Sequence, residues 1–391
     1  MAEYLVPGVY VEETSTRPKP IAGVPTSTAG FIGPSHKGPI KRATLVRSLA
    51  DFERTYGNGR GLRLDGGTLQ PNYAWHAVRA FFKEGGRRLY VARVPRWKAR
   101  ECRQALKYLE TAGEISIVAA PGSTFGQQGD GADTSIATLL IEHAERMRYR
   151  FAVLDSGPGQ SIERVRAMRA RLTSSEAALY YPWVRVKDPA SARDLSLPPS
   201  GFIAGISARI DLARGASASP ANETVTLAVG LDDTLTEAAQ AGLNAESINC
   251  IRAIGPRDYR VWGGRTLSTD AEWKYISLRR LFLYLEHSID KGTQWAVFEP
   301  NAEPLWANIR RTVENFLLSE WRTGKLPGAK PEEAFFVTCD RSSMTQADID
   351  QGRLICVIGV AMVRPAEFVI FRIGQWTADR PPSRAKRRRP R

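Results

Sequence analysis

Apolar residues recur at helical spacing in the C-terminal half of the chain and predict a long helix there. Thr269 precedes this pattern and Glu272 follows three residues later, which is a capping-box signal. Gly292 comes after the last apolar position and predicts the end of the helix. The apolar positions of the pattern are Trp273, Ile276, Leu281, Leu285 and Ile289.

A second helix is predicted from near Ala302 to just before Gly324. Its apolar face consists of Leu305, Ile309, Val313, Phe316, Leu317 and Trp321. Between the two helices we expect a short strand from Gln294 to Phe298, closed by a Pro-Asn turn.

Residues 98–186 alternate helical periodicity with short, continuous apolar runs. The helical patterns cover 99–109, 136–147 and 162–172, and the predicted strands are Ile115 to Ala119, Phe151 to Leu154 and Ala178 to Tyr181. Such alternation is typical of a parallel sheet covered by helices, so this part predicts an α/β fold. A further helix is predicted at 198–215 and a strand-like stretch at 224–231.

Both ends of the chain carry strand signals. Val9 and Val11 alternate with Tyr10 and Glu12 between flanking prolines, so we expect residues 1–25 to form an extended arm; a disordered terminus is the alternative. Residues 28–94 predict a small mixed α/β unit. Strands are also predicted at 334–339, 353–363 and 367–375. The last of these is apolar on both faces and therefore needs a covering partner.

Bulk composition is that of a globular protein with two or three domains. The chain has 391 residues, of which 43% are hydrophobic and 25% charged. No apolar run is long enough for a membrane span, and the first residues lack a signal-peptide pattern. Four cysteines, Cys102, Cys250, Cys339 and Cys356, form no CxxC pair, so we expect reduced, buried thiols and no metal site.

The net charge of +14 is concentrated at the C-terminus. The last twelve residues contribute +7 and contain no acid. Prolines and the lack of apolar residues favour a disordered, solvated tail, and the alternative is a contact with an acidic surface or nucleic acid.

The sequence offers no catalytic constellation. None of the four histidines lies in the Gly-flanked context of a subtilisin-type base, and no GxSxG motif is present. Asp155 ends a predicted strand without partners. Gly157 to Gly159 lacks the third glycine of a dinucleotide loop and predicts a tight turn. We therefore expect no enzyme activity, cofactor or metal.

Seven segments, in order, resemble the contractile tail sheath family. They are PGVYVEE (7–13), DFERTYG (51–57), AFFKEGGRRLYVARV (80–94), VWGGRTLS (261–268), WKYISLRRL (273–281), VFEPN (297–301) and PAEFVIFRI (365–373). This family forms the sheaths of contractile phage tails, phage-tail-like bacteriocins and extracellular contractile injection systems. The resemblance leaves out residues 195–221 and the basic end.

The resemblance implies an α/β fold, α+β overall, with a subtilisin-like α/β central domain that has no catalytic triad. An α/β C-terminal sheath domain with extended N- and C-terminal arms completes it. The implied division is an arm (1–25), the N-terminal mixed α/β part (26–95), the subtilisin-like domain (96–255), the C-terminal core with an exchanged strand (256–376) and a basic tail (377–391).

The resemblance also implies a structural function. Subunits would polymerise as stacked hexameric rings around an inner tail tube and contract to drive the tube through a target envelope. Further implied partners are baseplate and terminator or cap proteins, without membrane insertion and without nucleic acid. Assembly would take place in the bacterial cytoplasm, and the product would be a virion tail or a released contractile particle.

Two sets of residues follow from this expectation. The exchanged strands would be Gly8, Val9, Tyr10, Val11, Glu12 and Glu13 at one end and Phe368, Val369, Ile370, Phe371, Arg372 and Ile373 at the other. The candidates for contact with the inner tube are Arg279, Arg280, Arg310, Arg311 and Arg322, for which a solvated helix face is the alternative. A competing hypothesis is a soluble α/β enzyme of degenerate hydrolase type with a basic tail that binds nucleic acid.

Overall fold

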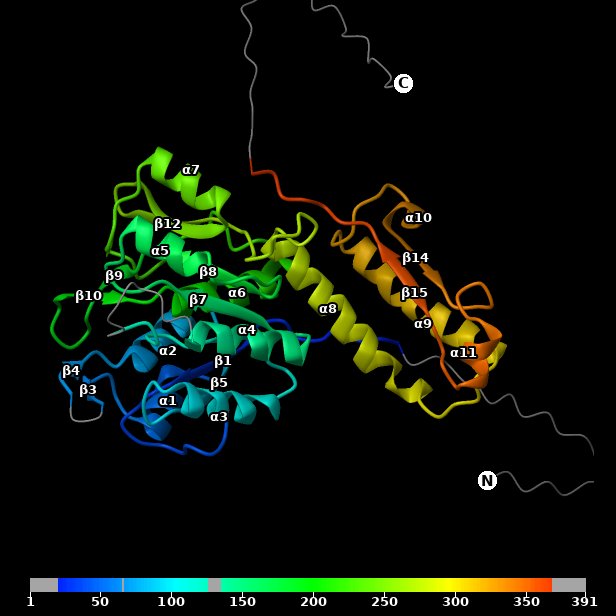
Figure 1. Cartoon of the computed structure of the whole chain (residues 1–391), viewed down its shortest axis with the longest axis horizontal. Coiled ribbons are helices and arrows are strands. Elements are labelled where there is room, and N and C mark those ends of the chain that lie inside the picture. Colours follow the sequence, from blue (N-terminus) through cyan, green and yellow to red (C-terminus); the bar gives the residue numbers. More distant parts are fainter. Residues whose placement is uncertain (1–19, 65–66, 126–134, 368–391) are drawn as a thin grey trace, which may run out of the picture.

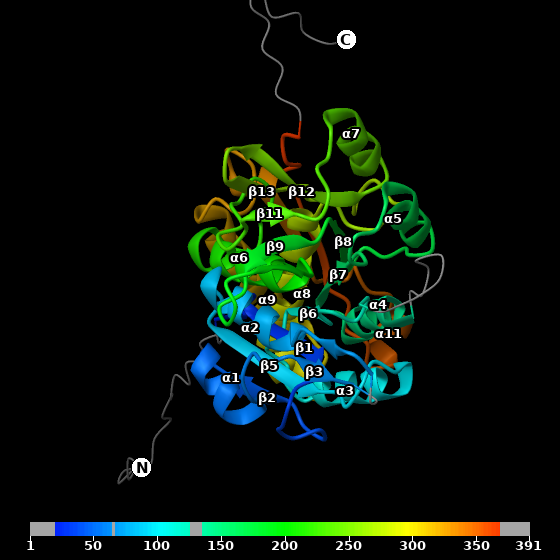
Figure 2. The same cartoon turned by 90° about the vertical axis from the view of Figure 1, so that its left-hand side faces the viewer.

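The computed structural model describes residues 20–64, 67–125 and 135–367, which form a large α/β unit and a smaller C-terminal unit (Figure 1). Helix α8 (Ile276–Thr293) lies between the two units, and half of its side chains are buried. In the view of Figure 2, the large unit lies in front of α8 and of the C-terminal elements. No helix among the described residues is both long and apolar enough to cross a membrane.

The large unit is built on an eight-stranded sheet. In spatial order its strands are β13 (Asp258–Trp262), β12 (Ile248–Gly255), β8 (Ala177–Tyr181), β7 (Phe151–Asp155), β6 (Ile117–Ala119), β1 (Thr28–Gly33), β5 (Arg88–Arg93) and β2 (Thr44–Val46). The six inner strands are parallel, and the two edge strands β13 and β2 are antiparallel to their neighbours. Short apolar runs form these inner strands because both of their faces are buried.

Helices cover both faces of this sheet. Alternate residues of each strand belong to different core clusters: Phe151 and Val153 pack on one side, and Ala152 and Leu154 on the other. One side is covered by α2 (Tyr73–Lys83) and α6 (Ser200–Arg214), with α1 (Leu49–Tyr56) beside them. The other side is covered by α3 (Ala99–Glu110), α4 (Ser135–Met147), α5 (Ile162–Arg169) and α7 (Glu237–Ala245). The predicted α/β class is confirmed, and the subtilisin-like topology within it stays a prediction.

Helix α6 approaches α2 closely because two of its residues lack side chains. A Cβ atom at Gly201 would lie 2.7 Å from Cα of Ala77, and one at Gly205 would lie 2.6 Å from the carbonyl oxygen of Phe81. These distances leave no room for any other residue type. The spacing of the two glycines, one helical turn apart, therefore determines how closely the two helices pack.

Smaller strands flank the large sheet. A three-stranded antiparallel sheet contains β10 (Asp194–Leu197), β9 (Val184–Lys187) and β11 (Gly230–Leu231), and a two-stranded sheet contains β3 (Leu62–Arg63) and β4 (Leu69–Gln70). Of the strand-like stretch predicted at 224–231, only the last two residues lie in a named strand.

The C-terminal unit packs around the second predicted helix. Its elements after α8 are η1 (Gln294–Ala296), α9 (Glu303–Arg322), α10 (Pro331–Ala334), β14 (Phe335–Thr338), α11 (Gln346–Asp350) and β15 (Val357–Val360). The apolar face of α9 and one face of the two-stranded β14–β15 sheet share a core with α8. Gly324 follows α9 with a φ of 77°, as its predicted role at the helix end requires.

The predicted start of the first long helix is wrong. Instead of beginning after Thr269, α8 begins at Ile276. The preceding segment forms a loop in which Thr266 donates hydrogen bonds from N to Lys274 O (2.8 Å) and from Oγ1 to Trp273 O (2.6 Å). These bonds hold residues 266–274 in a loop, and the N-cap residue of α8 is Tyr275 instead of Thr269.

Two further local predictions at the end of α8 are also wrong. The helix continues past Gly292 to Thr293, and residues 294–296 form a 3₁₀ turn instead of a strand. Phe298 then has a φ of 72° and a fully exposed side chain, so this segment does not have strand geometry.

Two of the predicted domain boundaries fall within the large sheet, and the division into domains stays a prediction. A boundary between residues 95 and 96 would divide the large sheet, because β1 lies between β5 and β6 and pairs with both. A boundary after residue 255 would separate β12 from β13, which form an antiparallel pair. Strand order depends on long-range pairing, which local sequence patterns do not reveal.

Candidate assembly surfaces

The chain that follows the predicted N-terminal arm is fixed against helix α8. The backbone N–H of Val24 donates to the buried Oγ of Ser288 (3.1 Å). Ile21 lies against Gly292, where an added Cβ would be only 2.6 Å from the isoleucine Cγ1. Gly292 therefore makes room for Ile21 rather than ending the helix. The described chain thus enters the fold at the C-terminal end of α8.

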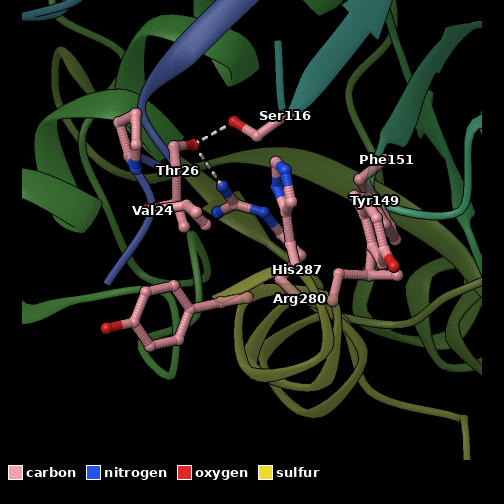
Figure 3. A pocket seen from close by; sticks show the side chains of 10 residues that line it. Val24, Thr26, Ser116, Tyr149, Phe151, Arg280 and His287 are labelled. Carbon is pink, nitrogen blue, oxygen red and sulfur yellow. Dashed lines mark hydrogen bonds between the residues drawn. The ribbon is translucent and has the colours of Figure 1, made fainter. Parts of the chain in front are cut away.

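Arg280 joins this entry segment to both units. Its guanidinium donates two hydrogen bonds to the carboxylate of Asp211 on α6, from Nη1 to Oδ1 (2.9 Å) and from Nη2 to Oδ2 (2.6 Å). Nη2 also donates to the carbonyl oxygen of Thr26 (3.2 Å), which accepts a second hydrogen bond from Ser116 (Figure 3). The Arg280 and Asp211 side chains are only 5% and 1% exposed. Burial raises the pKa of Asp211, and the positive charge of Arg280 opposes that shift.

Arg279 is held in a similar way by the large unit. Its Nη2 donates to Oε1 of Glu176 (2.6 Å), and its guanidinium lies 4.8 Å from the centre of the Trp273 ring. Both arginine side chains are therefore largely buried, and their predicted contact with the inner tube stays a prediction. Acids distant in the sequence bind both side chains inside the chain.

Helix α9 presents the remaining predicted arginines differently. Arg310 is partly exposed and lies 3.8 Å from the Asp340 carboxylate. Arg311 and Arg322 are exposed, and they are about three helical turns apart, so they lie on one face. The exposed residues Asn315 and Ser319 lie between them on that face. The structure thus places Arg311 and Arg322 on an outward face of the C-terminal unit.

Among the described residues, one face of the β14–β15 sheet is apolar and exposed. Val337 and Ile358 point toward α9, whereas Phe336 and Val357 point away from it and are 58% and 44% exposed. Each strand of this sheet also has one edge without a neighbouring strand among the described residues. Open edges and exposed apolar side chains are features that favour the addition of further strands.

The chain leaves the described fold at the opposite end of α8. Glu367 accepts hydrogen bonds from Arg265, at 2.8 Å from Nε and 2.6 Å from Nη2, and from the hydroxyl of Tyr275 (3.2 Å). Tyr275 is the N-cap residue of α8. The predicted exchanged strands, Gly8 to Glu13 and Phe368 to Ile373, lie outside the described residues, as does the basic tail.

Asp155, the residue that the sequence analysis considered as a possible catalytic acid, caps the start of a helix. Asp155 accepts hydrogen bonds from the backbone N–H (2.7 Å) and Oγ (2.6 Å) of Ser200, the first residue of α6. Burial raises the pKa of Asp155 to about 7.

The four histidines contact other groups: His36 bonds to Arg60, His76 packs on Trp75, His143 bonds to Arg150 and His287 stacks on Tyr149. Among the described residues, no cluster of three or more His, Cys, Asp or Glu is arranged to hold a metal.

Two family models match consecutive parts of the chain. Residues 100–267 match the phage tail sheath protein central domain, and residues 268–375 match the phage tail sheath C-terminal domain. The boundary between the two matches falls in the loop before α8. The residues of the first model cover most of the large sheet, and those of the second cover α8, α9 and the β14–β15 sheet.

Individual relatives agree with these family models. A putative prophage major tail sheath protein of Pseudomonas aeruginosa (strain UCBPP-PA14) is 29% identical over 261 residues, which cover 64% of this chain and 65% of that protein. A chain of the anti-feeding prophage helical sheath in the contracted state is 31% identical, with a TM-score of 0.77 and coverage of 95% of this chain and 100% of that one.

A chain of the contracted PVC sheath complex, from an extracellular contractile injection system, is 28% identical. Its TM-score is 0.78, with coverage of 97% of this chain and 100% of that one. The match therefore extends across both units of the fold. The chain belongs to the contractile tail sheath family and has a structural, non-enzymatic role.

Proposed function

We propose that this chain is a sheath subunit that polymerises as stacked hexameric rings around an inner tail tube and contracts to drive the tube through a target envelope. The observation that carries the proposal is the match, over nearly the whole chain, to subunits of contracted helical sheaths. The competing hypothesis of a degenerate hydrolase is wrong, because the family is structural.

Strand exchange at the β14–β15 sheet would link the subunits. An isolated two-stranded sheet is marginally stable in water, and added strands would pair with its open edges. We propose that Gly8 to Glu13 of one subunit and Phe368 to Ile373 of another supply these strands. Main-chain hydrogen bonds would then hold the subunits together while their globular units change position.

The places where the two arms join the fold support this arrangement. The N-terminal arm joins beside Gly292 and the C-terminal strand joins beside Tyr275, at opposite ends of α8. A helix of 18 residues is about 27 Å long. Tension between the two arms would therefore act along α8, and the Arg280–Asp211 ion pair ties that helix to the large unit.

The outward face of α9 is the proposed contact with the inner tube. It contributes Arg311 and Arg322, with Arg310 beside them, and all three would attract an acidic tube surface. Baseplate and terminator proteins are the proposed partners at the two ends of the sheath. Assembly would take place in the bacterial cytoplasm, and contraction would draw its free energy from new contacts between subunits.

Electron microscopy of the full-length chain tests this proposal. Negatively stained samples should show striated tubes of uniform width. A variant lacking residues 1–19 should keep the circular dichroism spectrum of the full chain but remain monomeric, because it retains Ile21 and lacks the donor strand. A variant lacking residues 377–391 is the matched control and should still form tubes. Long tubes from the first variant would disprove strand exchange through the N-terminal arm.

A further inference from the structure

Two cysteines that are distant in the sequence lie next to each other in the C-terminal unit. Cys339 directly follows β14 and Cys356 directly precedes β15. The ladder pairs Phe335 with Val360 and continues to Thr338 with Val357. The next opposed pair in the same register is Cys339 with Cys356. All four cysteines are free thiols, as predicted, but Cys356 is partly exposed rather than buried.

The hydrogen-bond pattern of the ladder shows what kind of pair this is. Ala361 N donates to Ala334 O (2.7 Å), so the pair that precedes Phe335 and Val360 is hydrogen-bonded. Bonded and non-bonded pairs alternate along an antiparallel ladder, which makes Cys339 and Cys356 a non-bonded pair. Such pairs have Cα atoms about 4.5 Å apart, within the range of about 4.4–6.8 Å that a disulfide spans.

The two thiols also interact directly, and they lie beside a groove that is open to solvent. A hydrogen bond between the two side chains lowers the pKa of Cys339 and raises that of Cys356. Cys356 is partly exposed. Cys339 is itself buried but lines an open groove of about 390 Å³ together with Trp306 and Arg310. The other two cysteines, Cys102 and Cys250, are buried in the large unit, where burial raises the pKa of each to about 12.

We propose that Cys339 and Cys356 are a site of reversible oxidative modification, at which a peroxide closes a disulfide across the end of the β14–β15 ladder. The Cys339 thiolate attacks one peroxide oxygen, which forms a sulfenic acid and releases hydroxide. Cys356 then loses its proton and attacks the sulfenic sulfur, which displaces a second hydroxide. In sum, two thiols and one hydrogen peroxide give one disulfide and two waters.

The disulfide would stabilise the two-stranded β14–β15 sheet of the C-terminal unit. It would close the loop of residues 340–355, which contains α11, and would prevent β14 and β15 from separating at that end. A reducing cytosol keeps such a pair as thiols, whereas an oxidising medium favours the disulfide. This inference concerns the chemistry of the chain itself and does not depend on its assembly into a sheath.

Mass spectrometry of the intact, full-length protein tests the proposal. After treatment with hydrogen peroxide, the chain should lose the mass of two hydrogen atoms, and proteolysis should release a peptide in which Cys339 is linked to Cys356. Dithiothreitol should restore the original mass. Thermal unfolding of the oxidised protein should shift upward by several degrees. Cys356→Ser should abolish the mass change and the shift, whereas Cys102→Ser should leave both unchanged.

Three outcomes would overturn the proposal. The first is a Cys339 that remains a free thiol under conditions that fully oxidise dithiothreitol. The second is oxidation of Cys339 to sulfinic acid without a disulfide. The third is a disulfide that joins two chains, which a non-reducing gel separates from the intramolecular product. Cys339→Ala provides a second variant if Cys356→Ser is poorly folded, because alanine suits the buried position.

Discussion

The large unit and the C-terminal unit each contain a sheet packed against helices, yet within the described part of the chain only the larger sheet is covered on both faces. The eight-stranded sheet has helices on both sides and buries alternate residues in two separate cores. The β14–β15 sheet has two strands, packs on α9 with one face and exposes Phe336 on the other. In the large sheet, most backbone hydrogen-bonding groups and apolar side chains are paired or buried. The β14–β15 sheet leaves apolar surface and backbone groups available to a partner.

This difference separates folding from assembly. Substitutions in the large unit, or at its junction with α8, should reduce the stability of the monomer. Substitutions on the outer face of the small sheet should leave the monomer intact and impair polymerisation. Variants in each region can therefore test whether monomer stability and polymerisation depend on different parts of the molecule.

The largest loss of stability is expected at the junction of the two units. Arg280→Ala should lower the free energy of unfolding by about 3–5 kcal/mol, because it leaves the carboxylate of Asp211 buried without its partner. Unfolding in urea, followed by tryptophan fluorescence, measures this change. Arg310→Ala is the matched control; it removes a partly exposed arginine 3.8 Å from Asp340 and should cost less than about 0.5 kcal/mol. Equal losses in the two variants would show that the buried pair does not join the units.

A loss of stability of intermediate size is expected when the pH is lowered, and its source should be a histidine in the large unit. His143 accepts a hydrogen bond from Arg150 (2.7 Å), and burial together with that positive charge lowers the pKa of His143 to about 3. A histidine with a lowered pKa contributes stability that is complete above its unfolded pKa of about 6.5 and is lost as pH falls toward about 3. At pH 4.5 the loss should be about 2–3 kcal/mol.

Chemical unfolding of His143→Gln at several pH values checks this effect. The glutamine oxygen can still accept from Arg150 but does not take up a proton, so the dependence between pH 6.5 and pH 4.5 should become weaker. His36→Gln, at an exposed position, is the control and should retain the dependence of the original chain. An unchanged pH dependence in the His143 variant would rule out this histidine as the source of acid sensitivity.

Sequence patterns predicted those elements of the fold that a local pattern of apolar residues specifies. The apolar runs of β6, β7 and β8 and the periodicity of α3, α4 and α9 correspond to buried faces, so their position along the chain was predictable. The place of β1 between β5 and β6 was not, because pairing between distant strands leaves no local pattern.

The candidate surfaces were less predictable for the same reason. Arg279 and Arg280 had the pattern of a basic helix face, but their partners Glu176 and Asp211 lie 103 and 69 positions away. Exposed Arg311 and Arg322 had no such partners in the described part of the chain. The proximity of Cys339 and Cys356 could have been predicted only by pairing the strands β14 and β15 as antiparallel neighbours in the correct register.

The smallest change in monomer stability is expected on the open face of the small sheet. Phe336→Ser removes a side chain that is 58% exposed, so the free energy of unfolding should change by less than about 1 kcal/mol. The same substitution should nevertheless reduce tube formation severely, because added subunits would cover this apolar face and its loss removes buried area from every repeated contact. Sedimentation and negative-stain microscopy measure the polymer, and urea unfolding measures the monomer.

Leu69→Ser tests whether the effect depends on location. Leu69 is also exposed, at 63%, but it lies in β4 of the large unit, away from the small sheet. It should change neither monomer stability nor tube yield. If both serine variants polymerised normally, the apolar face of β14 and β15 would not be an assembly surface, and the open strand edges alone would have to hold neighbouring subunits. If Phe336→Ser instead unfolded the monomer, the small sheet would be part of the self-sufficient core, and the distinction between the two units would fail.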